Sequence, residues 1–241
     1  MLCAQNLTIP GRLSGVSADL GPGAITAICG PNGAGKSSLL MALASLLEPV
    51  SGRVSLDGAA LSAIHPRERA KRIGYLPQSA EVAWDVSVAN LVRLGRLPHR
   101  DRGDEAVERA MAALDLEDLR RRPASQLSGG EKARALLGRV LAGEPEWILA
   151  DEPLAALDLA HQQALLKHLR AAADAGTGVV IVLHDLATAM NHADRVLVLN
   201  EGALVTDGNP EQTLSSKIIA DVWGVETHWI GEPAARALVT A

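Results

Sequence analysis

Apolar residues fall in short blocks along the chain, and four of these blocks contain almost no polar positions. They cover residues 24–29, 73–76, 147–150 and 179–183. A strand with one face in water alternates apolar and polar residues, whereas a strand covered on both faces is continuously apolar. The blocks therefore predict the strands of a parallel sheet enclosed between helices, in an α/β fold. Residues 38–47, with leucines on more than one face, are expected to form one of those helices and to be buried.

Helical spacing dominates the middle of the chain. In residues 104–114 the apolar side chains recur on one helical face, namely Val107, Ala110, Met111 and Leu114. Residues 131–141 repeat this spacing. We therefore predict a helical subdomain over residues 80–143, inserted into a core formed by residues 1–79 and 144–241, all within a single domain.

Composition narrows the classes of protein to consider. With 48% hydrophobic residues the chain can form a sizeable core, which argues against intrinsic disorder. Its 23 Lys and Arg residues against 28 Asp and Glu leave a formal net charge of -5, which gives no reason to expect a nucleic-acid partner. Two cysteines are too few for a disulfide framework, and no apolar run approaches the ~20 residues that span a bilayer. We expect a soluble chain that could still dock on a membrane protein.

A glycine-rich segment follows the first apolar block and precedes a predicted helix. It matches the phosphate-binding pattern G-x-x-x-x-G-K-S/T through Gly30, Pro31, Asn32, Gly33, Ala34, Gly35, Lys36 and Ser37, with Ser38 next. Glycines let backbone N–H groups converge on phosphate oxygens, and the helix start adds the positive end of its dipole. Lys36 is expected to reach the β- and γ-phosphates and Ser37 to bind Mg²⁺. A dinucleotide-binding fold would need the spacing G-x-G-x-x-G, which this segment lacks.

Two carboxylates end the apolar block at residues 147–150. Asp151 is expected to hold Mg²⁺, and Glu152 to polarise the attacking water as a general base. An ordinary strand that ends in acidic loop residues would look similar, but the phosphate loop upstream favours a nucleotide site. No N-K-x-D base-reading motif occurs in the chain, which argues against a GTPase.

A second helix start with exposed glycines lies between these two motifs. In Leu127-Ser128-Gly129-Gly130-Glu131 the serine is a candidate N-cap, and the glycines leave backbone N–H groups open to an anion. If the two phosphate-binding helix starts face different directions, each nucleotide needs two chains.

The order of these motifs resembles that of ATP-binding cassette (ABC) ATPases over nearly the whole chain. L-S-G-G-E between the two nucleotide motifs is the signature of that family. Gln78, at the end of Tyr75-Leu76-Pro77-Gln78, resembles its Q-loop, residues 154–158 resemble its D-loop, and His184 resembles its switch histidine. The resemblance implies a P-loop NTPase fold with a RecA-like, mainly parallel core sheet, an N-terminal antiparallel β subdomain and an inserted α-helical subdomain.

The same resemblance implies roles for several residues. Gln78 would sense Mg²⁺ and the attacking water while contacting a transmembrane partner, and His184 would touch the γ-phosphate of ATP. Ser128 and Gly130 would contact the γ-phosphate bound by the opposite subunit, and Asp158 would couple the two sites. The family thus implies a homodimer that encloses two ATP molecules.

A single cassette without a membrane span looks like the ATPase of a bacterial importer. The family then implies two transmembrane permease subunits, a periplasmic or extracellular substrate-binding protein, and a peripheral position on the cytoplasmic face of the inner membrane. The segment Leu94-Gly95-Arg96-Leu97-Pro98-His99 resembles the branch that imports iron-siderophores, haem or cobalamin. Trp84 is expected either to touch the permease or to lie in the core. An importer for a metal ion or an oxyanion such as molybdate, and a non-transport ABC ATPase, stay open as alternatives.

The nucleobase has no obvious aromatic partner in this chain. Most ABC ATPases stack an aromatic residue, placed upstream of the phosphate loop, on adenine, but no Phe, Tyr or Trp precedes Tyr75 here. The segment Ile9-Pro10-Gly11-Arg12 is expected at that place. Ile9 or Pro10 would give apolar contact, or Arg12 would stack its guanidinium plane on the base. We therefore expect weak base selection.

Overall fold

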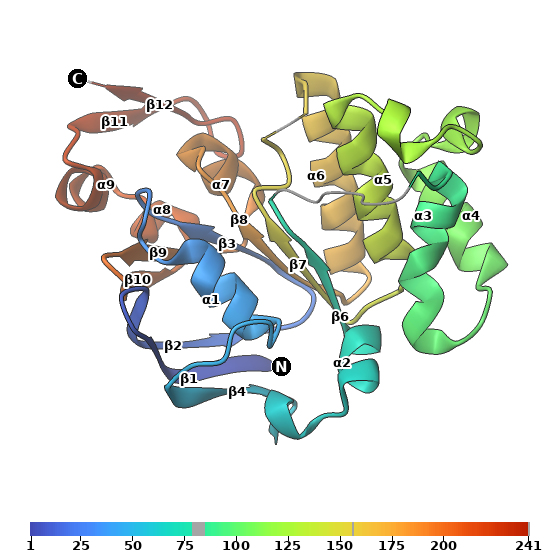
Figure 1. Cartoon of the computed structure of the whole chain (residues 1–241). Helices are drawn as coiled ribbons and strands as arrows, with labels where there is room; N and C mark the ends of the chain where they lie inside the picture. Colours follow the sequence, from blue (N-terminus) through green and yellow to red (C-terminus); the bar gives the residue numbers. More distant parts are fainter. Residues whose placement is uncertain (79–84, 156, 241) are drawn as a thin grey trace.

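The computed structural model describes residues 1–78, 85–155 and 157–240. Within them, the central feature is a six-stranded sheet in the order β10-β9-β3-β8-β7-β6 (Figure 1). Neighbouring strands in it are parallel except β9 and β10, which form an antiparallel hairpin. Its strands are β3 (Ile25–Cys29), β6 (Ile73–Leu76), β7 (Trp147–Asp151), β8 (Gly178–Val182), β9 (Arg195–Asn200) and β10 (Ala203–Gly208).

The two faces of this sheet pack against two different clusters of buried apolar residues. Along β7, Ile148 and Ala150 belong to the apolar cluster formed with the helices on one side, whereas Leu149 belongs to the cluster on the other side. The helices of the first side include α5 (Gly129–Ala142), α6 (Leu159–Asp174) and α7 (Leu186–His192). Because both faces are covered, the strands carry few polar residues, which explains the continuous apolar blocks in the sequence.

The second side of the central sheet is covered by α1 (Lys36–Leu43) and an antiparallel sheet. That sheet has the order β2-β1-β4-β5 and consists of β1 (Leu2–Ile9), β2 (Leu13–Leu20), β4 (Ser51–Leu56) and β5 (Ala59–Ala60). Helix α1 lies between the two sheets, with Leu39, Leu40 and Leu43 buried (Figure 1). The helix that starts at the phosphate loop is therefore held on both sides.

The middle of the chain forms a group of helices beside the central sheet, drawn mostly in green in Figure 1. It contains α3 (Val88–Arg93), the 3-10 segment η2 (Leu94–His99), α4 (Asp104–Ala113), η3 (Glu117–Leu119), η4 (Ala124–Gln126) and α5. The α/β class, the mainly parallel sheet, the antiparallel N-terminal strands and the helical subdomain confirm the predicted fold class. The predicted subdomain boundary at residue 80 and the predicted contacts of Trp84 lie outside the described residues.

The remaining elements connect and complete the core. They are η1 (Leu61–Ala63), α2 (Pro66–Arg72), α8 (Pro210–Thr213), α9 (Ser216–Trp223) and the C-terminal hairpin of β11 (Thr227–Ile230) and β12 (Ala237–Thr240). None of the helices in the described residues combines the length and the apolar character that a membrane-spanning helix requires.

One helix is shorter than the leucine pattern predicts. Helix α1 ends at Leu43, and the chain turns at Ser45, whose φ is 55°. Leu46 then has 60% of its surface exposed, so the expectation that this leucine is buried was wrong. The cause lies in the tertiary structure: the chain leaves the helix to rejoin the antiparallel sheet, where Val50 N donates to Thr8 O at 2.9 Å.

Candidate nucleotide-binding site

The phosphate loop joins the end of β3 to the start of α1, and glycine is required at both of its ends. Gly30 has a φ of 151°, and a Cβ there would lie 2.2 Å from the carbonyl oxygen of Leu199. Gly35, which caps α1 in the left-handed conformation, would place a Cβ 2.4 Å from the carbonyl oxygen of Arg12. The loop therefore packs backbone against backbone and leads into a helix start, a place that attracts anions.

Lys36 lies inside the curve of this loop. Its Nζ donates to the carbonyl oxygens of Gly30 and Pro31, both at 2.9 Å, and the residue is buried. Burial lowers the pKa of Lys36, and the carboxylate of Glu152 opposes that shift. The ammonium group is thus held at the loop by weak carbonyl partners that phosphate oxygens can replace.

Ser37 and Asp151 bring oxygen atoms together from the helix start and the end of β7. Ser37 Oγ donates to Asp151 Oδ1 at 3.1 Å, and Asp151 is only 5% exposed. Burial raises the pKa of the Asp151 carboxyl, while the Ser37 hydrogen bond acts in the opposite direction. A hydroxyl and a carboxylate in contact form the donor set that Mg²⁺ prefers, so these residues fit the ion predicted there.

Glu152 is held on both sides by residues from neighbouring strands. Gln78 Nε2 donates to Glu152 Oε2 at 2.6 Å, and His184 Nε2 lies in close contact with Glu152 Oε1. The three residues follow β6, β7 and β8, which are adjacent in the sheet and parallel. Glu152 itself has a φ of 49°, a left-handed conformation that is uncommon outside glycine. The carboxyl ends of parallel strands, where α/β folds bind ligands, thus bring these side chains together.

One open cleft of about 780 Å³ gathers most of the residues predicted from the sequence. Its lining consists of Gly11, Arg12, Asn32, Gly33, Ala34, Gly35, Lys36, Ser37, Ser38, Gln78, Glu152 and His184. Gly11 belongs to the segment Ile9-Pro10-Gly11-Arg12 that was expected near the base, although no contact of its own was predicted for it. Of the candidates for the base, Arg12 lines the cleft, whereas Ile9 is 6% exposed and packs in the core.

With this geometry established, comparison with known proteins identifies the family. The chain matches the ABC transporter family over residues 13–155, which is more than half of its length. The hemin import ATP-binding protein HmuV of Streptomyces coelicolor is 42% identical over 232 residues, covering 94% of this chain and 83% of that protein.

The chain belongs to the ABC transporter family.

Solved structures of other ABC proteins share its fold. A metal-chelate type ABC transporter in an inward-facing conformation has a TM-score of 0.84 and 26% identity, covering 100% of this chain and 97% of that chain. A dimeric ATP-binding cassette in a post-hydrolysis state, bound to ADP and phosphate, has a TM-score of 0.76 and 27% identity, covering 87% and 99%. As an ABC protein, the chain is an ATPase that binds ATP, and the family implies transmembrane permease partners and a peripheral association with the membrane.

The signature segment of this ABC protein lies outside the cleft of its own chain. Ser128 caps α5 in a capping box: its Oγ accepts from Glu131 N at 3.3 Å, and the Glu131 carboxylate accepts from Ser128 N at 2.8 Å. Hydrogen bonding from Ser128, chiefly from its backbone N–H, lowers the pKa of the Glu131 carboxyl. Neither Ser128, Gly129 nor Gly130 lines the cleft that contains Lys36. Within one chain, the structure therefore does not bring the two phosphate-binding helix starts together.

Asp158 is also placed away from the cleft. It caps α6 by accepting a hydrogen bond from His161 N at 2.9 Å, and its carboxylate contacts His161 Nδ1 at 2.7 Å. These contacts lower the pKa of the exposed Asp158 carboxyl. In this chain Asp158 therefore serves as the N-cap of α6.

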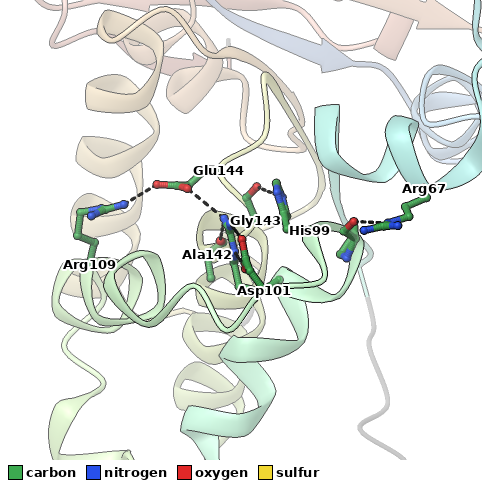
Figure 2. Close-up of polar contacts among 9 residues, drawn as sticks. Arg67, His99, Asp101, Arg109, Ala142, Gly143 and Glu144 are labelled. Atoms are coloured by element: carbon green, nitrogen blue, oxygen red, sulfur yellow. Dashed lines mark hydrogen bonds and ion pairs between the residues drawn. The ribbon is translucent and has the colours of Figure 1, made fainter.

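The L-G-R-L-P-H segment of this ABC protein forms η2 and packs on the C-terminal end of α5 (Figure 2). Arg96, 7% exposed, donates through Nε and Nη2 to the Asp101 carboxylate at 2.9 and 2.7 Å. Its Nη1 donates to Ala142 O at 3.2 Å and to Glu144 Oε2 at 3.0 Å, while His99 Nε2 lies 3.0 Å from Gly143 O. The segment thus supplies a positive group, the Arg96 guanidinium, to the carbonyl end of the helix whose other end carries the signature.

Proposed function

We propose that this chain is the ATP-hydrolysing subunit of a bacterial importer for a metal chelate, with haem as the favoured cargo. The 42% identity to a hemin import ATP-binding protein and the fold shared with a metal-chelate type transporter support this cargo class. The η2 segment, which resembles the same branch in sequence, adds to that support. Iron-siderophores and cobalamin belong to the same class of chelates.

The observation that carries the proposal is the convergence of Lys36, Gln78, Glu152 and His184 on one cleft. ATP would place its phosphates on the loop, where Lys36 exchanges the carbonyl oxygens of its own loop for phosphate oxygens. Glu152 would accept a proton from the attacking water, with Gln78 and His184 orienting that water and the γ-phosphate. Developing negative charge would be stabilised by Lys36 and by the loop N–H groups.

Mg²⁺ fits the oxygen atoms of Ser37 and Asp151, and Gln78 lines the same cleft as Ser37. When bound, the ion would neutralise charge on the phosphate oxygens. The chain's own contribution is to hold the serine hydroxyl at the helix start and the aspartate at the end of β7.

A second copy of the chain would complete each site. Ser128, Gly129 and Gly130 present a capped helix start that does not line the cleft of the same chain, and they would meet the ATP held by the other copy. Asp158 would lie between the two sites. The homodimer would act on two permease subunits at the cytoplasmic face of the membrane, with a substrate-binding protein delivering the chelate on the opposite side.

A variant at Glu152 tests the ATPase proposal. Glu152→Gln keeps the size of the side chain but removes its basicity, so it should still bind ATP and dimerise with Mg²⁺ present. Turnover should fall by about 10²–10⁴, the range for a lost general base. Dimerisation is measured by light scattering and turnover by phosphate release. Hydrolysis near the normal rate would exclude Glu152 as the base.

Cargo is tested separately. The chain is purified from membranes with its polytopic partner and reconstituted in proteoliposomes containing ATP. Uptake of haem that depends on ATP and is lost in Glu152→Gln would support the proposal. Uptake of cobalamin, a ferric siderophore or molybdate instead would assign another cargo, and co-purification with only soluble proteins would contradict a role in transport.

A further inference from the structure

The turn between β7 and α6 joins two residues that have separate places in the proposed reaction. It begins at Glu152, the proposed base, and ends at Asp158, the N-cap of α6. Near its start, Ala155 N donates to Glu152 O at 3.2 Å. In its second half, Leu157 N donates to Leu154 O at 3.1 Å. The backbone of Glu152, whose φ is 49°, and the Asp158 carboxylate therefore belong to one hydrogen-bonded turn.

Gln162, in the first turn of α6, holds this turn from the helix. Its Nε2 donates to Leu154 O at 3.2 Å and to Leu157 O at 3.1 Å. Only the nitrogen of the amide can face two carbonyl oxygens, so both of its hydrogens are used. Leu154 and Leu157 are themselves buried, and the amide thus pins the turn to α6 where the turn enters the core.

His161, the preceding residue, holds the end of the turn through Asp158. Its backbone N and its Nδ1 both reach Asp158 Oδ1, at 2.9 and 2.7 Å. Because a carboxylate only accepts hydrogen bonds, Nδ1 is the donor. The Asp158 side chain is 66% exposed, so hydrogen bonds from His161, and not packing, set the direction of the carboxylate.

The anchored turn also lies beside the helix that carries the signature. Leu157 and His161 line a small cavity together with Ala133 of α5. Ser128, the N-cap of α5, and Asp158 both lie outside the cleft of their own chain, and both would meet a second copy in the proposed dimer. The turn is therefore the segment that joins the proposed base to the proposed dimer contact.

We infer that His161 and Gln162 are positioning residues for ATP hydrolysis, which hold the turn that carries Glu152 at one end and Asp158 at the other. The inference rests on the proposed hydrolysis at Glu152 in a dimer. Neither residue lines the nucleotide cleft, so both act through the turn and not on the nucleotide. Misplacing a reacting group by about 1 Å costs about 10²-fold in rate. Loss of these anchors therefore lowers kcat without weakening nucleotide binding.

Variants of matched shape separate the hydrogen bonds from the packing. His161→Leu and Gln162→Met remove the donors, and should lower kcat for ATP by roughly 10- to 100-fold. The Kd for ADP with Mg²⁺, measured by calorimetry, should stay within about twofold, because ADP lacks the γ-phosphate on which the reaction takes place. His161→Asn has the branched shape of leucine but keeps an N–H near the place of Nδ1, and should recover most of the rate.

Two controls lie on the same helix. Gln163 is exposed and His168 lines the same small cavity as His161, yet neither side chain forms a hydrogen bond with a described residue. Gln163→Met and His168→Leu should therefore hydrolyse ATP at the wild-type rate. Thermal unfolding checks that every variant folds, and Gln162→Glu, which also removes the donors, replaces Gln162→Met if methionine destabilises the chain.

Three results would overturn the inference: a wild-type kcat in His161→Leu or in the Gln162 variant, no recovery in His161→Asn, or a parallel loss of ADP binding. The wild-type chain separates the two levels of the argument. If it releases no phosphate from ATP, the proposed function itself fails. If it hydrolyses ATP and the variants do so equally well, only the positioning role of His161 and Gln162 fails.

Discussion

The side-chain amide of Gln78 donates a hydrogen bond to the Glu152 carboxylate at 2.6 Å, across 74 positions of sequence. His184 contacts the other oxygen of the same carboxylate. The proposed base is thus held by the two residues that would orient water and the γ-phosphate.

Because both partners act on one carboxylate, their removal should not be additive. Gln78→Ala and His184→Ala are each expected to lower single-turnover hydrolysis by roughly 10- to 100-fold, while ATP binding is retained. The hydrolysis rate of the double variant should fall by much less than the product of the two single-variant factors, since residues that share a partner are coupled. Quenched-flow measurement of one turnover gives all three values. A loss equal to the product would show that the two residues act independently.

Ser128 combines a cap with a predicted contact across the dimer, and two variants separate these roles. Asp and Asn are N-caps as good as Ser, so Ser128→Asp and Ser128→Asn should unfold within about 0.5 kcal/mol of the wild type. Only the aspartate adds negative charge where the other subunit's triphosphate is expected. In the Glu152→Gln background, ATP should therefore still dimerise Ser128→Asn but not Ser128→Asp. Normal dimerisation of the aspartate variant would place this residue away from the nucleotide.

The Arg96 cluster should contribute to stability rather than to hydrolysis. Arg96→Ala removes hydrogen bonds to Asp101, Glu144 and Ala142 O (Figure 2), and should lower the free energy of unfolding by about 1–3 kcal/mol. Arg102→Ala is the control, because the Arg102 side chain is 81% exposed and its loss should cost less than about 0.5 kcal/mol. Urea denaturation compares the two. Equal losses would show that burial of Arg96 has no energetic consequence.

Acid should reduce the difference in unfolding free energy between the wild type and Arg96→Ala. Arg96 lowers the pKa of the Asp101 carboxyl in the folded chain through its hydrogen bonds. A carboxyl with a lowered folded pKa stabilises the protein above its unfolded pKa and loses that effect as the pH falls through the folded value. The stability gap between wild type and Arg96→Ala should therefore be largest near neutral pH and narrow on acidification. A gap that widens in acid would contradict the ion pair.

Gly178 at the start of β8 should tolerate no side chain. A Cβ there would lie 2.4 Å from atoms of the Trp147 ring, which is itself 2% exposed. Gly178→Ala should destabilise the chain by about 1–3 kcal/mol through overpacking and shift the tryptophan fluorescence. Gly21→Ala is the matched control, because its Cβ would have nothing within 4 Å. The control should be neutral or slightly stabilising, and a similar loss in both variants would rule out the ring contact as the cause.

The sequence by itself determined those parts of the site that are formed by a few consecutive residues. The phosphate loop, the acidic end of β7 and the cap at Ser128 each depend on a few consecutive residues whose backbone conformation and polarity are readable directly. Continuous apolar blocks determined the buried parallel strands, because a strand covered on both faces cannot place polar groups on either.

Only the tertiary structure decided how these segments meet. The strand order β3-β8-β7-β6 places Gln78, Glu152 and His184 at one edge of the sheet beside the loop. The packing of the antiparallel sheet against the central one buries Ile9 and leaves Arg12 in the cleft. Pairing between strands that are distant in sequence depends on which apolar faces pack together, and no local pattern records that choice. The sequence therefore names the chemistry of the site, whereas the packing of the sheets selects which side chains share it.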